Sequence, residues 1–152
     1  MDAIKKEGKM SQPQVQVLII MPEKAQQYVM QKQLQYHCDC RVLAPQSHSS
    51  GAEIFLKLLA TQSAAALPDL IIADFRGSWW GAQAFNTTAF NFITWVRQTH
   101  PKIKILGLIT LDDPAMPDAQ QAVSNGLVHG LLSKPWGLQD LKAAVDSLRS
   151  AQ

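Results

Sequence analysis

Short apolar runs alternate with longer stretches of mixed polarity along nearly the whole chain. The first run, residues 15–20, is rich in branched side chains and is interrupted only by Gln16. Such a run is typical of a strand that is covered on both faces, as in a parallel sheet. The same pattern predicts strands at residues 15–20, 40–43, 70–73, 103–109 and 128–132.

The stretches between these runs carry apolar residues at helical spacing, most clearly Leu138, Leu141, Val145 and Leu148. A stripe of this kind predicts a helix that buries one face. The predicted helices are residues 22–36, 49–59, 90–100, 117–125 and 138–148.

Prolines and glycines set the expected ends of these helices. Pro22 suits the first helical turn, and Glu23 would complement the positive end of the helix that follows. Pro101 disfavours continuation of the third helix beyond His100. Gly126 follows the fourth helix, where the chain often turns left-handed.

Five strands that alternate with five helices predict a doubly wound α/β fold. Each parallel crossover needs a helix, so we expect a five-stranded parallel sheet with helices on both faces. At 152 residues, the chain is long enough for one domain and too short for two ordinary ones. We assign that domain to residues 14–150. Residues 1–13, which are polar and locally basic, are expected to form a flexible tail.

Composition and charge exclude several classes of protein. With 47% apolar and 17% charged residues, the chain is expected to fold rather than remain disordered. Its 14 basic and 12 acidic residues are spread along the sequence, so no nucleic-acid partner is expected. No run reaches the roughly 18 apolar residues of a membrane span, and no signal peptide is recognised. We therefore expect a cytoplasmic protein with no membrane partner.

Cys38 and Cys40 lie too close in sequence to staple a fold. Together with His37 they could begin a metal site, but a fourth ligand at suitable spacing is missing. Reduced, structural thiols are the expectation.

Three residues with complementary chemistry stand where predicted strands end: Asp74, Thr110 and Lys134. In a doubly wound sheet these ends lie side by side at one crevice. A carboxylate can accept a phosphoryl group, a hydroxyl can donate to a phosphoryl oxygen, and an ammonium can pair with the added charge. The alternative is a buried Asp74–Lys134 ion pair, with Thr110 satisfying a backbone group.

The segment 75–89 is long for a connection between a strand and a helix, and it directly follows Asp74. Arg76 could cover a metal position and pair with Asp74, or be a solvated arginine. Trp79 and Trp80 could form a lid over the crevice, anchor a protein partner, or simply pack.

Three segments, taken in order, resemble the receiver domain of two-component response regulators. Residues 68–74 resemble that family's phosphoacceptor strand, and residues 105–110 resemble the strand that ends in its switch hydroxyl. Residues 122–136, which end in Lys-Pro-Trp, are the closest match. The resemblance spans about residues 15–150 and implies a flavodoxin-like sheet of order 2-1-3-4-5.

The resemblance implies a role for each residue of the crevice. Asp74 would be the phosphoacceptor, Thr110 the phosphate-sensing hydroxyl and Lys134 the charge partner. It also implies a cis Lys134–Pro135 bond.

The chain departs from the family pattern after the first strand. Where the family places an acidic pair that holds magnesium, this chain has Met21 and Pro22, whose side chains cannot ligate a hard cation. Glu23, one position further, could lean back toward the crevice or act only as a first-turn acid. Leu131 stands where the family commonly carries an aromatic residue, so the usual aromatic readout is not expected.

These observations predict a stand-alone receiver-like signalling module that acts through protein contacts, with weak or absent magnesium-dependent phosphorylation. No enzyme activity and no cofactor are expected, and Mg²⁺ would matter only if phosphorylation is retained. The expected partner is a histidine kinase, a phosphotransfer protein or a downstream effector. The alternatives are a working phosphoacceptor at Asp74 and, more remotely, a small-ligand-binding flavodoxin-like domain, for which the chain lacks a glycine-rich phosphate loop.

Overall fold

The computed structural model describes residues 14–74, 88–114 and 116–150. Arg76, Trp79, Trp80 and the predicted tail 1–13 therefore lie outside the described residues. The strands are β1 Val15–Ile20, β2 Cys40–Val42, β3 Leu70–Asp74, β4 Lys104–Thr110 and β5 Gly130–Lys134. The helices are α2 Lys24–His37, α3 Ser49–Gln62, η1 Ala64–Ala66 (a 3-10 turn), α4 Thr88–Thr99, α5 Met116–Ser124 and α6 Leu138–Ser150.

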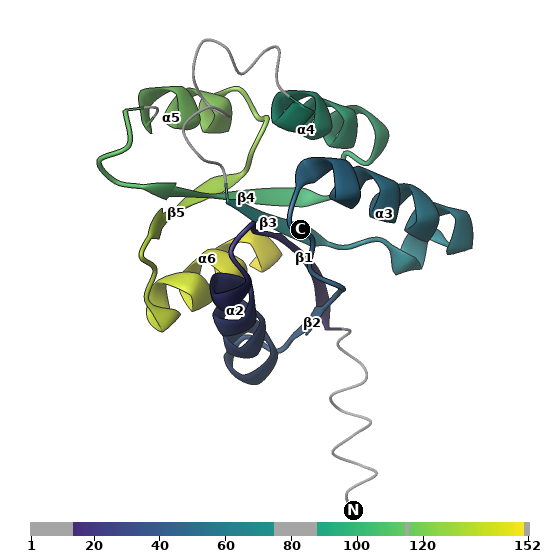
Figure 1. The fold of residues 1–152 in the computed structure, drawn as a ribbon, viewed down its shortest axis with the longest axis horizontal. Coiled ribbons are helices and arrows are strands. Elements are labelled where there is room, and N and C mark those ends of the chain that lie inside the picture. Colours follow the sequence, from purple (N-terminus) through teal and green to yellow (C-terminus); the bar gives the residue numbers. More distant parts are fainter. Residues whose placement is uncertain (1–13, 75–87, 115, 151–152) are drawn as a thin grey trace, which may run out of the picture.

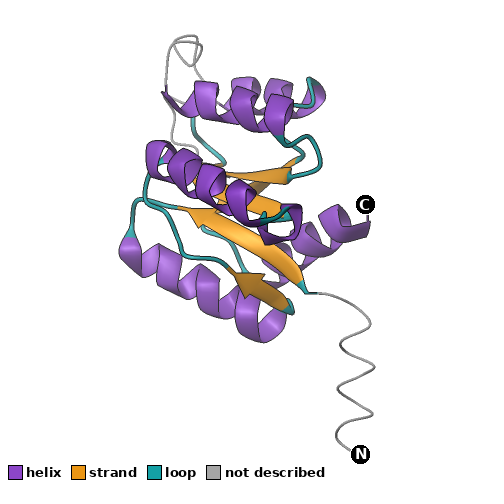
Figure 2. Cartoon of the chain, turned by 90° about the vertical axis from the view of Figure 1, so that its right-hand side faces the viewer, coloured by secondary structure: helices purple, strands orange, loops and turns teal. Residues whose placement is uncertain are grey.

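The five strands form one parallel sheet in the order β2-β1-β3-β4-β5. Helices α3, α4 and α5 cover one face of this sheet, and α2 and α6 cover the other (Figure 1). Figure 2 shows the same three layers from the side, with the strands between the two groups of helices. The predicted doubly wound, flavodoxin-like fold of order 2-1-3-4-5 is confirmed.

The apolar side chains divide into two clusters because successive residues of a strand point to opposite faces. In β1, Leu18 and Ile20 join the cluster beneath α3, α4 and α5, whereas Val17 and Ile19 join the cluster beneath α2 and α6. All four are at least 98% buried. Burial on both faces explains why the strands read as continuous apolar runs rather than as alternating patterns.

The start of α2 differs from the prediction. The helix begins at Lys24, with Glu23 as its N-cap in an extended conformation, so neither Pro22 nor Glu23 lies in the first turn. Backbone pairing explains the delay. Ile20 forms a bridge with Gln46, and the Met21 N–H donates to the Gln46 carbonyl at 2.9 Å. This pairing holds Ile20 and Met21 in an extended conformation at the end of β1, so the chain turns into the helix only after them.

The fifth strand also begins later than predicted, at Gly130 rather than at Val128. Gly126 closes α5 with φ 78°, the left-handed conformation expected there. The N–H groups of Leu127 and Val128 then donate back to the carbonyl of Ala122 in α5. The Val128 side chain is buried in the core, but its backbone N–H is hydrogen-bonded to the end of the helix and not to a neighbouring strand.

His129 lengthens the β4–β5 ladder by using its side chain. Its backbone N–H donates to the Ile105 carbonyl at 2.8 Å, and its Nδ1 accepts the Ile105 N–H at 3.0 Å. Nδ1 can accept only when the imidazole is neutral at that nitrogen. Burial, together with the positive charges of Arg97 and Lys104, lowers the pKa of His129 from 6.5 to about 4.

We predict that this histidine makes folding stability depend on pH. As the pH falls from about 6.5 toward about 4, the unfolded chain binds a proton at His129 that the folded chain does not. A full one-proton difference is worth about 1.4 kcal/mol per pH unit, but His129 is only partly buried and solvent screening reduces the effect, so we expect a total loss of about 1–2 kcal/mol. Above about pH 6.5, His129 is neutral in both the folded and the unfolded chain, so it adds no further pH dependence to the stability. Urea unfolding at several pH values measures the loss.

The matched variant is His129→Gln, whose amide oxygen can accept the Ile105 N–H without titrating. Other groups titrate in both proteins, so the difference between the two stability curves isolates His129. The variant should lose less stability than the wild type on acidification. Parallel curves would contradict the prediction.

Candidate functional site

The carboxyl ends of β3, β4 and β5 bring together the three residues selected from the sequence. Asp74, Thr110 and Lys134 are each the last residue of their strand, and Thr110 and Lys134 are register partners. Asp74 is buried, with 5% of the residue exposed, whereas Thr110 is exposed. The predicted convergence of these three strand ends is therefore present in the structure.

Asp74 and Lys134 form an ion pair. The Lys134 Nζ donates to Asp74 Oδ2 at 2.8 Å, and the two side chains are 19% and 2% exposed. Because β4 separates β3 from β5, the lysine side chain crosses over the end of β4 to reach the carboxylate. The ion pair that the sequence left as one of two alternatives is thus formed. It places an ammonium where it would also reach a phosphoryl group on Asp74.

The Lys134–Pro135 peptide bond is cis, as the resemblance implied.

Met21 does not occupy a position from which a metal could be held. Its side chain is fully buried in the cluster that contains Met30, Leu34 and Leu108. Its carbonyl accepts a hydrogen bond from the buried amide of Gln27, which also donates to the Gln46 carbonyl at 3.3 Å. Met21, at which the resemblance would have an acidic residue, is therefore part of the core.

A magnesium ion needs several oxygen ligands in a near-octahedral arrangement. Of the positions considered for it, Met21 is apolar and buried, Pro22 has no ligating side chain, and Glu23 is the exposed N-cap of α2. Within the described ranges, no group of three His, Cys, Asp or Glu side chains could hold a metal ion. The described residues therefore do not fit the magnesium site that the fold would suggest.

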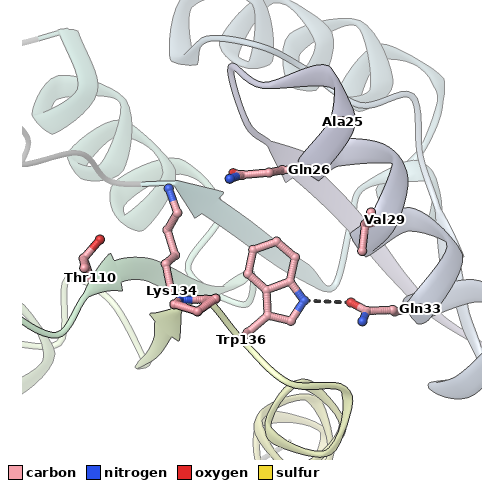
Figure 3. A pocket seen from close by; sticks show the side chains of 8 residues that line it. Ala25, Gln26, Val29, Gln33, Thr110, Lys134 and Trp136 are labelled. Atoms are coloured by element: carbon pink, nitrogen blue, oxygen red, sulfur yellow. Dashed lines mark hydrogen bonds between the residues drawn. The ribbon is translucent and has the colours of Figure 1, made fainter.

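A cavity of about 510 Å³ adjoins Lys134 and Thr110. It lies between α2 and the segment that joins β5 to α6 (Figure 3). The Trp136 indole forms part of its wall, and its Nε1 donates to Gln33 Oε1 at 2.7 Å. Trp136 therefore has two contacts: it packs against the apolar cluster beneath α2 and α6, and it lines this cavity.

The sequence pattern predicts no structural or site role for Gln26, Gln27 and Gln33 of α2. In a helical pattern each of them only dilutes the apolar stripe. In the structure Gln27 is 6% exposed and anchors the loop before α2, while Gln26 and Gln33 line the cavity. Spacing gives a partial signal, since Gln26 and Gln33 are seven residues apart and share a helical face.

The two cysteines are free and buried, in agreement with the expected structural thiols. Burial raises the pKa of Cys40 to about 12, with a further contribution from Cys38, and burial also raises the pKa of Cys38. Thiols held in the protonated form are poor nucleophiles and metal ligands. They make no contribution to the site at the strand ends.

No family model matches the chain, and no curated protein matches it. Solved structures do match. The isolated REC domain of RcsB from Salmonella enterica serovar Typhimurium has a TM-score of 0.68 and 18% identity, over 91% of this chain and 90% of that one. The Vibrio cholerae chemotaxis protein CheY4 has a TM-score of 0.65 and 20% identity, over 90% and 99%.

A third match, described as an adenylate cyclase from Rhodopirellula baltica, has a TM-score of 0.68 and 21% identity, over 90% of this chain and 87% of that one. Identities this low establish the fold and not the function. Several of the structural neighbours are described as receiver domains or response regulators, so the chain has the receiver-domain fold. No helix in the part of the chain that the structure describes is long and apolar enough to span a membrane.

We predict that the Asp74–Lys134 pair contributes strongly to stability. Lys134→Met leaves a buried carboxylate without this ammonium, and the free energy of unfolding should fall by about 2–3 kcal/mol. In the double variant with Asp74→Asn, part of this loss should be recovered, with a coupling energy of at least about 1 kcal/mol. Urea unfolding of the four proteins at neutral pH measures the cycle.

Lys57→Met is the matched control. Lys57 pairs with Glu53 at 2.9 Å, but these side chains are 59% and 36% exposed. The control should lose less than about 1 kcal/mol, because exposed pairs are weak. Equal losses for Lys57→Met and Lys134→Met would contradict the prediction.

Proposed function

We propose that this chain is a signal-transduction module of the response-regulator receiver type that acts through protein contacts, with weak or absent magnesium-dependent phosphorylation. The observation that carries the proposal is the pairing of a buried Asp74 with Lys134 at a crevice where Met21 packs in the core. The carboxylate keeps the position of a phosphoacceptor, but the described residues lack the acidic neighbours that would hold a divalent ion.

Electrostatics supports weak metal binding. A unit-charge pair in contact is worth about 4 kcal/mol at an effective dielectric constant of about 20, and a divalent ion roughly doubles that for each carboxylate before desolvation is subtracted. Met21 and Pro22 supply none of this attraction. Thr110 and Lys134 cannot replace it, since a hydroxyl is neutral and an ammonium repels a cation.

The proposed partner is a protein: a histidine kinase, a phosphotransfer protein or a downstream effector. One exposed face of α2 supports a protein contact. Tyr28 and Tyr36 are 62% and 71% exposed, and the Lys32 ammonium lies between them, 5.3 Å and 5.6 Å from the two ring centroids. Aromatic side chains of this kind are enriched in protein interfaces.

The second candidate is a working phosphoacceptor, favoured by the convergence of Asp74, Thr110 and Lys134 at neighbouring strand ends. In that case the Asp74 carboxylate would attack the phosphorus of a phosphodonor and form an acyl phosphate, while the donor group leaves with the bonding electrons. Lys134 would pair with the phosphoryl charge. Arg76 as a substitute for the metal, and Trp79 and Trp80 as lid or anchor, remain proposals from the sequence.

Incubation with acetyl phosphate, with and without magnesium, separates the two candidates. We expect intact-mass spectrometry to show at most a minor species heavier by one phosphoryl group, with little change when magnesium is added. A receiver domain with an intact acidic pair serves as the positive control for the donor.

Asp74→Asn is the control for site identity, because the amide keeps the size of the side chain and cannot form an acyl phosphate. A major, magnesium-dependent phosphorylated species that disappears in Asp74→Asn would establish the second candidate and overturn the first.

A further inference from the structure

The cavity beside Lys134 has the construction of a small-molecule site. Its volume of about 510 Å³ falls within the usual range of roughly 300–1,000 Å³ for ligand pockets. Ala25, Val29, Pro135 and Trp136 supply apolar walls, while Gln26, Thr110 and Lys134 supply polar groups. In Figure 3 the side chain of Gln26 extends from α2 toward the side chain of Lys134 at the end of β5, and the Trp136 indole lies beside them.

One polar atom at this cavity has no hydrogen-bond partner among the residues that the structure describes. Within those residues, the Oε1 of Gln26 is buried and accepts no hydrogen bond. Leaving a buried acceptor unpaired is costly, and a ligand that donates to it would recover that cost. The terminal amide torsion of glutamine is broad, so a small rotation can turn this oxygen toward the cavity.

Lys134 and Thr110 supply hydrogen-bond donors at the same cavity, whereas Gln26 Oε1 supplies an acceptor. An ammonium has three N–H donors, and Lys134 directs one of them to Asp74 at 2.8 Å. Its side chain remains 19% exposed, and its register partner Thr110 is an exposed residue that also lines the cavity. Because Asp74 already balances the lysine charge, the acceptor that this end favours is a neutral oxygen.

We propose that this cavity binds a small, flat aromatic molecule that carries, at one end, a hydrogen-bond donor beside a neutral acceptor oxygen, as a carboxamide does. The donor pairs with Gln26 Oε1, and the oxygen accepts from Lys134 or Thr110. The aromatic body packs against the Trp136 indole, which its bond to Gln33 holds in place. This inference goes beyond the proposed function and holds whether or not Asp74 accepts phosphate.

Cinnamamide and methyl cinnamate form a matched pair of probes. Both have the same flat apolar body and a carbonyl oxygen, but only the amide has N–H donors. Titration into the isotopically labelled full chain, followed by backbone and indole amide NMR, should locate cinnamamide at Ala25, Gln26, Val29 and Trp136. A dissociation constant on the order of 1 mM is expected for a ligand of this size. Methyl cinnamate should bind about fivefold more weakly.

Gln26→Leu tests the role of the unpaired oxygen, and Gln35→Leu, on α2 but outside the cavity lining, is its control. In Gln26→Leu the preference for the amide over the ester should disappear, and in Gln35→Leu it should persist. The NMR spectra of the variants also report whether each is folded.

Three outcomes would overturn the proposal. The first is no binding of cinnamamide at millimolar concentration, and the second is a set of shifted resonances that lie away from the cavity. Equal binding of the two probes to the wild type would mean that water satisfies Gln26 and that the cavity selects only apolar bulk. A failed phosphorylation experiment would leave these readouts unchanged, so the two proposals are tested separately.

Discussion

The ion pair between Asp74 and Lys134 is the interaction on which the crevice depends. It joins the ends of β3 and β5 across the end of β4, and so couples three neighbouring strands at one point. A carboxylate this deeply buried is tolerable only when it is paired and hydrogen-bonded. Lys134 therefore stabilises the structure of the unmodified protein by pairing with Asp74. The receiver resemblance implies a second role for it, pairing with the charge of a phosphoryl group.

Much of the fold could be predicted because burial on both faces leaves a direct trace in the sequence. The runs at β1, β3 and β4 are apolar at almost every position, and the helices between them require parallel crossovers. The boundaries that were wrong depend on tertiary hydrogen bonds. Gln46 pairs with Ile20 and Met21 and holds the chain extended just before the predicted helix start, and the Ala122 carbonyl accepts the Val128 N–H at the end of α5.

The site was predicted only in part, for a similar reason. Asp74, Thr110 and Lys134 could be identified because strand ends in a doubly wound sheet converge. The roles of Gln26, Gln27 and His129 could not, because each depends on a partner distant in sequence or on a cavity. A glutamine that anchors a loop and a glutamine in solvent look alike in a helical pattern. An imidazole that replaces a backbone carbonyl in a ladder leaves no periodic signal.

The burial of Met21 also constrains how this chain could change over evolution. An aspartate introduced at this position would lie in the apolar cluster that contains Met30 and Leu34, where a charge is poorly tolerated. A second acid at position 22 would not relieve that penalty until the surrounding apolar side chains had also changed. Building a magnesium site at this position would therefore need several concerted substitutions, because the first acid alone would lower the stability of the fold.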